Sequence, residues 1–545
     1  MRRAAAGLAQ ERRDRRRRPR TPAVLTVAAI AAVALVLLPL AYLVVRVAGG
    51  GTAAWRVLGR ERVWELVLDT GVLVLAVTAA AVAVAVPLAW LVTQTDLPGR
   101  RFFAVAAALP LVIPSYVAAL ALIAAFGPRG ALQRALAGPF GVERVPELYG
   151  FGGAFLALWL STYPYVFLLT AAALRRLDPG LEEAARALGR SPRGAFTSVT
   201  LPVLRPAISA GALLAALYTL SDFGAVSLMQ YDSLTRAIFL QYRALFDRTP
   251  AAVLALVLVA LTGALLALGA RGGARGRVSR SSPGSARTAA PHRLGRWRLP
   301  ALAFCSAVVG LALVLPVSVL VFWIARSLAL GRGLDLSLAP ALNSLLVSVL
   351  AALAAVAAAL PLAVLAVRHS SPWTRALERL SYLPNALPGL VIALSLVFFA
   401  ANYASPLYQT LTLLVIAYVV RFFPQALAGS HSALERVSPR LEEAGRSLGR
   451  SPARVFASVT APLVGSGLLA GATLVFLSTM KELPATLLLR PIGFDTLATE
   501  IWSATGLGFY SRAAVPALLL IVVSAPHVLL LGAHRDSSPA PGAPG

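Results

Sequence analysis

The sequence predicts an all-α polytopic membrane protein with about twelve transmembrane helices. Of its 545 residues, 58% are hydrophobic and only 13% are charged. The apolar residues occur in long blocks, and a membrane-spanning helix needs roughly 20 of them in succession. So high an apolar content excludes a disordered chain and argues against a series of soluble domains.

Twelve apolar blocks are long enough to cross a bilayer. In chain order they are 23–46, 68–92, 102–126, 151–174, 202–229, 250–270, 299–325, 341–367, 381–401, 408–430, 462–481 and 513–533. The first block follows the basic stretch RRDRRRRPR. It is longer than the apolar region of a signal peptide, which has roughly 7–15 residues, and it ends without a clear small-x-small cleavage site. We therefore expect a retained first helix that also targets the chain to the membrane.

The chain has 50 basic and 23 acidic residues, a formal net charge of +27. A charge of this sign is typical of nucleic-acid-binding proteins when it lies on a soluble domain. Here it is spread over the short segments between apolar blocks. With the N-terminus inside, basic residues are roughly twice as frequent on the inner side, as cytoplasmic loops require. This predicts two cytoplasmic termini, contact with membrane lipid, and no nucleic-acid partner.

Several classes of site have no support in the sequence. Cys305 is the single cysteine, and the five histidines are dispersed, so no metal site is expected. The single lysine, Lys481, lies in the string MKEL, so the phosphate-binding pattern GxxxxGK[ST] cannot occur. We expect no catalytic residue and no cofactor on this chain. If the protein is driven by ATP, the ATPase is another chain.

The chain is a tandem repeat. Residues 181–202 and 441–462 are identical at 15 of 22 positions, polar residues included. The predicted organisation is a basic cytoplasmic N-terminus (1–22), a first six-span half (23–270, core from about 66), an arginine-rich cytoplasmic linker (271–298), a second half (299–534, core from about 341) and a cytoplasmic tail (535–545). Because each half has an even number of spans, the repeats are parallel, with a pseudo-two-fold axis along the membrane normal.

The repeated segment predicts a short cytoplasmic helix in each half. Asp178-Pro179 and Ser438-Pro439 combine an N-cap residue with proline at the first helical position. Gly189 and Gly449 can supply a left-handed C-terminal turn. One face of each helix is apolar with small residues at its centre, which favours close approach of a partner. A turn resting on lipid fits less well, because the acidic pairs suit an anionic membrane surface poorly.

The repeated segment resembles the loop signature of ABC-importer permeases. That signature is E-A-A-x-x-x-G, nine residues, an aliphatic residue, one more residue and L-P. The residues that the resemblance assigns to ATPase coupling are Glu182, Glu183, Ala184, Ala185, Gly189 and Pro202 in the first copy, and Glu442, Glu443, Ala444, Gly445, Gly449 and Pro462 in the second. Gly445 and Ala461 depart from the pattern, and both are small.

The strings SDFGAVSLMQYDSLTRAIFLQY (221–242) and KELPATLLLRPIGFDTLATEIW (481–502) resemble ferric-iron permeases, in which two halves are fused. The resemblance covers about residues 60–535 and implies the type I ABC importer permease fold. It implies two copies of an ABC ATP-binding subunit that hold ATP and Mg, an extracytoplasmic solute-binding protein, and a bacterial plasma membrane. The expected solute is ferric iron. Permeases for thiamine, phosphonate, sulfate and polyamines are relatives, so these solutes stay open as alternatives.

Acidic residues near the outer end of the fifth span of each half are the candidates for a translocation pathway or gate. Asp222 and Glu482 occupy equivalent positions, and a carboxylate in a membrane segment marks function by default. The alternative is that both are solvated at the interface. Pro114 and Pro388 break helices that could line the pathway, and the role of Arg421 stays undecided.

Two functions compete at this stage. A permease of an ABC importer needs the repeated cytoplasmic loops. A secondary transporter of six plus six helices, driven by an ion gradient, needs coupling charges in mid-membrane and no ATPase dock. The loops are the most conspicuous repeat and favour the permease.

Overall fold

The computed structural model describes residues 22–127, 130, 148–244, 249–274, 291–331, 333 and 337–533. Within these ranges every regular element is helical, apart from an isolated parallel bridge between Thr95 and His292. The all-α prediction is therefore confirmed. The predicted N-terminal segment, the C-terminal tail and much of the linker lie outside the described residues.

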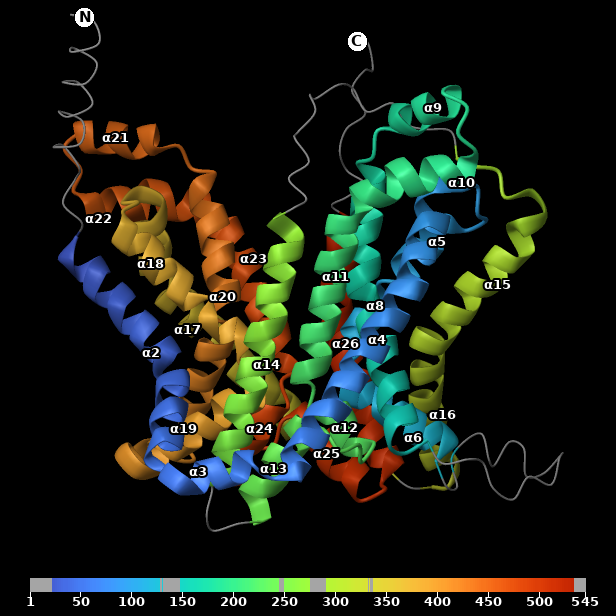
Figure 1. The fold of residues 1–545 in the computed structure, drawn as a ribbon. Helices are drawn as coiled ribbons and strands as arrows, with labels where there is room; N and C mark the ends of the chain where they lie inside the picture. The colour runs from blue at the N-terminus through green and yellow to red at the C-terminus, as the bar shows by residue number, and fades with distance from the viewer. Residues whose placement is uncertain are drawn as a thin grey trace, which may run out of the picture. The chain divides into compact units, whose positions relative to one another are not determined.

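Helix contacts divide the chain into two compact units, and both include segments far apart in the sequence (Figure 1). Unit 1 comprises residues 1–45 and 342–494, and unit 2 comprises residues 46–341 and 495–545. The division therefore crosses the two predicted sequence halves. The halves describe how the sequence is duplicated, whereas the units describe which helices pack together.

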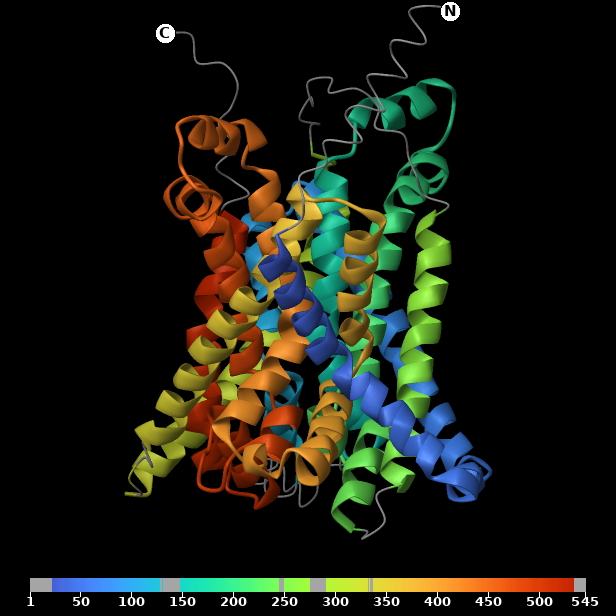
Figure 2. The ribbon, with the colours of Figure 1, turned by 90° about the vertical axis from the view of Figure 1, so that its left-hand side faces the viewer.

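The elements of unit 1 begin with the N-terminal helix and continue from the second half of the sequence. They are α2 (Ala23–Gly49, its end passing into unit 2), α17 (Leu338–Arg368), α18 (Pro372–Ser381), η5 (Leu383–Ala386), α19 (Gly389–Tyr403), η6 (Ser405–Leu407), α20 (Leu411–Glu435), α21 (Pro439–Ser447), α22 (Pro452–Val455), η7 (Phe456–Thr460), α23 (Ala461–Met480) and α24 (Pro484–Leu489). Helix α20 packs along α23, and α19 packs on α20 and α24. Helix α2 runs obliquely past these helices (Figure 2), and its Tyr42 ring lies edge-on to Phe399 at a centroid distance of 6.0 Å.

The elements of unit 2 come from the first half and from both ends of the second. They are α3 (Gly51–Leu58), α4 (Glu61–Gln94), α5 (Arg100–Ala106), η1 (Leu109–Val112), α6 (Ser115–Phe126), α8 (Phe151–Arg175), α9 (Pro179–Ala187), α10 (Pro192–Ala195), η2 (Phe196–Thr200), α11 (Leu201–Ser221), α12 (Gly224–Leu228), α13 (Leu234–Ala244), α14 (Thr249–Ala274), η3 (Gly295–Trp297), α15 (Arg298–Val309), η4 (Gly310–Val314), α16 (Leu315–Ala329), α25 (Leu497–Gly506) and α26 (Tyr510–Ala533). Helix α8 packs between α4 and α11, and α16 packs on α6 and α26. The face of α4 with Val77, Ala81 and Ala85 is fully buried, and its alanines permit close helix contact.

Among the described residues, nine helices are long and apolar enough to cross a membrane. Two further segments are bent pairs, Arg100–Val112 with Ser115–Phe126 (97°) and Pro372–Asn385 with Gly389–Tyr403 (102°), and Tyr510–Ala525 is a shorter apolar helix. These twelve segments correspond to the twelve predicted blocks. The third and ninth are broken rather than straight, and the fifth helix ends at Ser221 instead of continuing to residue 229.

Duplication extends to the way helices cross. A Cβ on Gly211 of α11 would lie 2.6 Å from the Cα of Val166 on α8, so only glycine fits there. Its repeat counterpart Gly471 on α23 faces Gly429 on α20, where a Cβ would lie 3.3 Å from the Cα of Gly429. Small residues at such crossings let helix backbones approach in a membrane.

Each unit also has a π-helical turn at an equivalent place of the repeat, and unit 2 has a further one at Gly310–Val314 (η4). Residues Phe196–Thr200 (η2) and Phe456–Thr460 (η7) immediately precede α11 and α23. Turns of this kind are rare. Their occurrence at the same repeat position indicates that the duplicated segments share backbone geometry as well as sequence.

Replacing Gly211 by valine should destabilise unit 2. The new side chain meets the α8 backbone, which cannot move aside as a flexible side chain can, and overpacking costs about 1–3 kcal/mol or more. Gly263→Val on α14 is the matched control, because a Cβ there meets nothing within 4 Å. Thermal unfolding of the purified chain in mild detergent should show a lower midpoint for the first variant alone. Equal midpoints would contradict a close α8–α11 crossing.

Candidate functional site

Helix α9 is held by capping interactions at both ends. The Asp178 carboxylate accepts a hydrogen bond from the Gly180 amide at 3.0 Å, and Pro179 follows as the first helical residue. At the other end, Gly189 has a φ of +85°. The Gly189 amide donates to the Arg186 carbonyl and the Arg190 amide donates to the Ala185 carbonyl, which is the Schellman arrangement. The predicted short helix and its left-handed end are confirmed.

Helix α21 repeats this design with one difference. Gly449 has a φ of +79°, and its amide donates to the Arg446 carbonyl while the Arg450 amide donates to the Gly445 carbonyl. Ser438 occupies the N-cap position before Pro439, but its side chain makes no capping hydrogen bond. The predicted N-cap is thus confirmed for Asp178. For Ser438 the position is right, but the expected capping hydrogen bond is not made.

The outward face of each short helix is apolar and exposed. Leu188 is 85% exposed and its counterpart Leu448 is 80% exposed. The residues that share this outward face are Leu181, Ala184 and Leu188 on α9 and Leu441, Ala444 and Leu448 on α21, all of them exposed. Glu183 and Glu443, next to this face, are exposed as well. Exposed leucines at a helix end that also carries acidic groups are typical of a surface that binds another protein.

The inward face of each helix is small because it packs on its own loop. Ala185 is buried in unit 2, and Gly445 is buried in unit 1. A Cβ on Gly445 would lie 3.0 Å from a methyl group of Val455, whereas Ala185 has the smaller Ala195 at the equivalent place. The second copy therefore has a larger side chain at one of two facing positions and no side chain at the other. This explains why the second copy departs from the alanine of the pattern.

An inward-facing carboxylate, half-buried in Glu182 and buried in Glu442, joins each short helix to the base of the long helix that follows. In unit 2 the Thr200 hydroxyl donates to Glu182 at 3.2 Å, and in unit 1 the Thr460 hydroxyl donates to Glu442 at 3.1 Å. Thr200 and Thr460 are the last residues of the two π-helical turns and are buried. Glu182 and Glu442 therefore face inward, so adjacent glutamates of each copy have different roles.

The carboxylate in unit 1 has further partners. The Arg368 guanidinium, at the end of α17, donates to Glu442 at 3.0 Å and to the Val437 carbonyl at 2.9 Å. The Arg446 guanidinium lies 3.5 Å from Glu442. The pKa of nearby His369 is lowered, chiefly because burial disfavours the charged imidazole and also because of Arg446, with Glu442 acting in the opposite sense. Glu442 therefore interacts with two permanent cations.

The carboxylate in unit 2 is held less firmly. Gln94, the repeat counterpart of Arg368, donates to the Leu174 carbonyl at 3.0 Å and carries no charge. The cation nearest to Glu182 is the His292 imidazole, 3.9 Å away and charged only when protonated. His292 belongs to the end of the linker. The two short helices therefore share a carboxylate–threonine link but differ in the charge that supports it.

Asp222 is buried at the junction of three segments. It is the C-cap residue of α11, and its carboxylate accepts hydrogen bonds from the Ala225 amide at 2.9 Å and the Val226 amide at 3.4 Å. The second carboxylate oxygen accepts a hydrogen bond from the Ser115 hydroxyl. Ser115 begins α6, directly after the break at Pro114. Asp222 therefore connects the end of α11 to α12 and to the broken helix.

Glu482 occupies the equivalent junction in unit 1. Its Oε2 accepts hydrogen bonds from the Ala485 amide at 2.9 Å and the Thr486 amide at 3.2 Å, at the start of α24. Its Oε1 lies 3.7 Å from the Nε of Arg421 on α20. In the described part of the chain the Glu482 Oε1 and Arg421 Nε atoms are buried and make no hydrogen bond. Burial shows that Asp222 and Glu482 are not simply solvated at an interface.

A substitution between the copies explains how the arginine is accommodated. Gly389 is the repeat counterpart of Ser115 and follows Pro388 directly. A Cβ on Gly389 would lie 2.5 Å from an Nη atom of Arg421 and 2.7 Å from Glu482. The glycine therefore leaves the space that the guanidinium fills. Where the first copy satisfies its carboxylate with a hydroxyl, the second uses an ion pair.

The proline breaks lie beside these junctions. Pro114 and Pro388 are buried and precede α6 and α19 with extended backbone angles, φ/ψ of −61°/149° and −57°/144°. Irregular backbone at membrane depth occurs where protein or a cavity covers it. Pro202 and Pro462, the last residues of the repeated loop pattern, stand in the first turns of α11 and α23.

Several residues at these sites are not among those predicted from the sequence. Thr200 and Thr460 lie within the repeated strings, so their identity in both copies was a usable signal. Ser115, Gly389 and Arg368 differ between the copies and gave no such signal. No group of three or more His, Cys, Asp or Glu residues within the described ranges could hold a metal ion.

Comparison with known families identifies the class of protein. Residues 81–278 and 355–534 match the family of binding-protein-dependent transport system inner membrane components, once in each half of the chain. The chain belongs to this family, whose members are transport permeases, and it is a multi-pass membrane protein.

Three characterised relatives illustrate the range. The chain is 36% identical over 501 residues to the Fe(3+)-transport system permease protein FbpB 2 of Haemophilus influenzae, covering 90% of this chain and 94% of the relative. It is 24% identical over 498 residues to the ferric transport system permease protein FbpB of Actinobacillus pleuropneumoniae, covering 86% of this chain and 71% of the relative. A sulfate transport system permease protein of Escherichia coli is 30% identical over 189 residues, 34% of this chain and 67% of the relative.

Replacing Arg421 by serine should destabilise unit 1, since it leaves the buried Glu482 carboxylate without a counter-charge. Removing one partner of a buried pair costs about 3–5 kcal/mol. Adding Gly389→Ser restores the hydroxyl that Ser115 supplies in the other copy, so the double variant should recover part of the loss.

Thermal unfolding of the purified chain in mild detergent provides the measurement. Gly389→Ser alone is the control and should itself be destabilising, because it crowds the guanidinium. The losses of the two single variants should not add in the double variant. Additive losses would mean that Gly389 and Arg421 are not coupled.

Proposed function

We propose that the chain is the permease subunit of an ATP-driven ABC importer, in which α9 and α21 each dock one copy of an ATP-binding subunit. One observation carries this proposal above the others. Two equivalent short helices turn exposed leucines outward, while a carboxylate bonded to a buried threonine holds the inward face of each helix. An exposed Leu188 or Leu448 has a large apolar area that a partner groove can cover.

The links from Glu182 to Thr200 and from Glu442 to Thr460 suggest how motion passes into the membrane. Closure of the ATP-binding subunits, which hold ATP and Mg, moves α9 and α21. Each carboxylate link then displaces the base of α11 or α23. The result is alternating access biased by ATP binding at a distance. ATP hydrolysis takes place on the partner, and this chain contributes transport without catalysis.

The proposed solute is ferric iron, delivered by an extracytoplasmic solute-binding protein. The similarity to the Haemophilus influenzae Fe(3+) permease over nearly the full length of both chains supports this choice. The sulfate permease matches only about a third of this chain. Thiamine, phosphonate and polyamines are the other solutes to be compared.

The proposed location is the bacterial plasma membrane, with both termini in the cytoplasm and two duplicated halves joined by the linker. The excess of basic residues on the side of α9 and α21 supports this orientation. A secondary transporter driven by an ion gradient is not favoured, because the chain belongs to a family of binding-protein-dependent permeases.

We assign Asp222, Glu482, Pro114 and Pro388 to the translocation pathway or gate. The Asp222 carboxylate connects the end of the fifth span to α6, the helix that begins after the break at Pro114, and Glu482 lies against Gly389, the first residue of α19 after Pro388. A change in the angle of that break must alter the carboxylate's hydrogen bonds. These junctions are therefore suited to a broken helix that changes between two conformations.

Leu188→Asp combined with Leu448→Asp should abolish recovery of the ATP-binding subunit when the complex is purified in mild detergent. The charges replace apolar side chains that are 85% and 80% exposed, so folding of the chain is unaffected while docking is lost. Ile492→Asp is the control, because Ile492 is 87% exposed and lies outside both short helices. Glu183→Arg with Glu443→Arg should weaken recovery in the same way. Undiminished recovery in both double variants would refute docking at α9 and α21.

Asp222→Asn combined with Glu482→Gln should impair solute uptake into cells or proteoliposomes while the ATP-binding subunit still copurifies. The amides keep the shape of the side chains but lose the charge on which the hydrogen-bond network depends. Radioactive ferric iron uptake, compared with copurification from the same cells, separates the two effects. Normal uptake by the double variant would remove these residues from the gate.

A further inference from the structure

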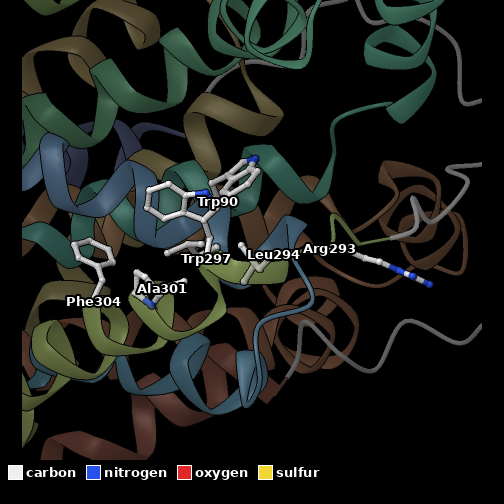
Figure 3. Close-up of a pocket in the computed structure, with 8 residues that line it drawn as sticks. Trp90, Arg293, Leu294, Trp297, Ala301 and Phe304 are labelled. Carbon is white, nitrogen blue, oxygen red and sulfur yellow. The ribbon is translucent and has the colours of Figure 1, made fainter.

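Unit 2 has an open, mostly apolar cavity of about 440 Å³ beside the start of α15. Its apolar wall includes Trp90 near the end of α4, and Trp297, Ala301 and Phe304 around the first turns of α15. Figure 3 shows the side chain of Arg293 extending away from these rings, and Arg293 is exposed. The cavity therefore has an apolar interior and a basic rim.

The end of the linker builds the outer wall of this cavity. The His292 amide donates to the Gln94 carbonyl at 2.8 Å, and the Asp96 amide donates to the His292 carbonyl at 3.1 Å. The Leu294 amide donates to the Asp96 carboxylate at 2.9 Å. The His292 ring also stacks on Trp90 at a centroid distance of 6.0 Å. These interactions fix the linker end against α4, so the cavity is a built feature.

The charge around the cavity is predominantly positive. Arg293, Arg296 and Arg298 are exposed on the linker end and the start of α15. Arg100 and Arg101 lie at the start of α5, which packs on α15. The acidic groups nearby already have partners: Asp96 accepts the Leu294 amide, and Glu182 accepts the Thr200 hydroxyl. An anion at the rim would therefore meet a surplus of guanidinium groups.

The position along the helices places the cavity at the edge of the membrane. Trp90 is four residues from the end of the span Glu61–Gln94, and Trp297 lies in the first turn of the span Gly295–Ala329. Trp297 is 62% exposed. Tryptophan and arginine side chains at such a boundary contact headgroups, while the apolar surface below contacts acyl chains.

We propose that this cavity binds one anionic phospholipid. Its phosphate interacts with Arg293 and Arg296, and an acyl chain lies along Trp297 and Phe304. The apolar interior and the basic rim match the two parts of a phospholipid, whereas a water-soluble phosphate would use the rim alone. In the second half Val364 stands at the position equivalent to Trp90, so the aromatic wall is not repeated there.

The binding is testable by native mass spectrometry of the full chain in mild detergent, titrated with phosphatidylglycerol or with phosphatidylcholine of the same acyl chains. The wild type should retain phosphatidylglycerol preferentially. Arg293→Gln with Arg296→Gln should weaken that binding by about 5-fold per arginine, since each basic residue near an anionic lipid contributes about that factor. Ala301→Trp fills the cavity and should remove the bound lipid of either kind.

The matched control is Arg56→Gln with Arg60→Gln, which removes the same charge from exposed positions at the opposite end of α4. It should bind phosphatidylglycerol as the wild type does, and all variants should elute from gel filtration as the wild type does. Glycerol phosphate at the same concentration should not displace the lipid. Equal retention by wild type, Arg293/Arg296 variant and Ala301→Trp would overturn the proposal, as would displacement by glycerol phosphate or equal retention of the two lipids.

Discussion

The hydrogen bond between an inward-facing glutamate and a buried threonine hydroxyl is the interaction on which each short helix depends. Glu182 and Thr200 in unit 2, and Glu442 and Thr460 in unit 1, are 18 residues apart along the chain, and the loop between them turns back on itself. A hydrogen bond to a charged group contributes about 1.5–3 kcal/mol, and a buried carboxylate left without one is strongly unfavourable. The link therefore resists separation of the short helix from the long one. A load applied to the exposed leucines passes to the base of α11 or α23 instead of unfolding the loop.

A second constraint acts at the other end of the same helices. Membrane segments must satisfy every backbone polar group internally. The chain ends α11 and α23 where a carboxylate can accept the first amides of the next short helix, α12 or α24. The same carboxylates interact with residues of the other segments at each junction, Ser115 or Arg421. Each long helix therefore has a polar anchor at both ends, a threonine at the base that adjoins the short helix and a carboxylate at the far end, with apolar packing between them.

Much of this arrangement is encoded locally and was predictable. The apolar blocks, the proline breaks and the left-handed glycines each follow from the properties of a few adjacent residues. The different orientations of Glu182 and Glu183 do not follow from adjacent residues. Neighbours on a helix point about 100° apart, and the pattern does not show which side packs inward. The membership of the two units was also inaccessible, since packing of α2 or α26 depends on partners hundreds of residues away. Ser115 and Gly389 escaped notice, and the partner of Arg421 stayed undecided, because comparison of the copies highlights what they share and these residues are where the copies differ.

Those differences are organised in compensating sets. The first set is Ala185 with Ala195 in the first copy and Gly445 with Val455 in the second. The second set is Ser115 with Ser161 in the first copy and Gly389 with Arg421 in the second. In each set one copy has more volume or charge at one position and less at its neighbour, so the space is filled in both copies and each carboxylate keeps a partner. A partly satisfied polar network is less stable than either complete version. Single residues therefore cannot be moved from one copy to the other, although whole sets can. The two copies therefore share a backbone but hold their carboxylates with different strength. In unit 1, Glu442 and Glu482 lie beside arginines, which are permanently charged. In unit 2, Glu182 and Asp222 lie among neutral groups and a histidine.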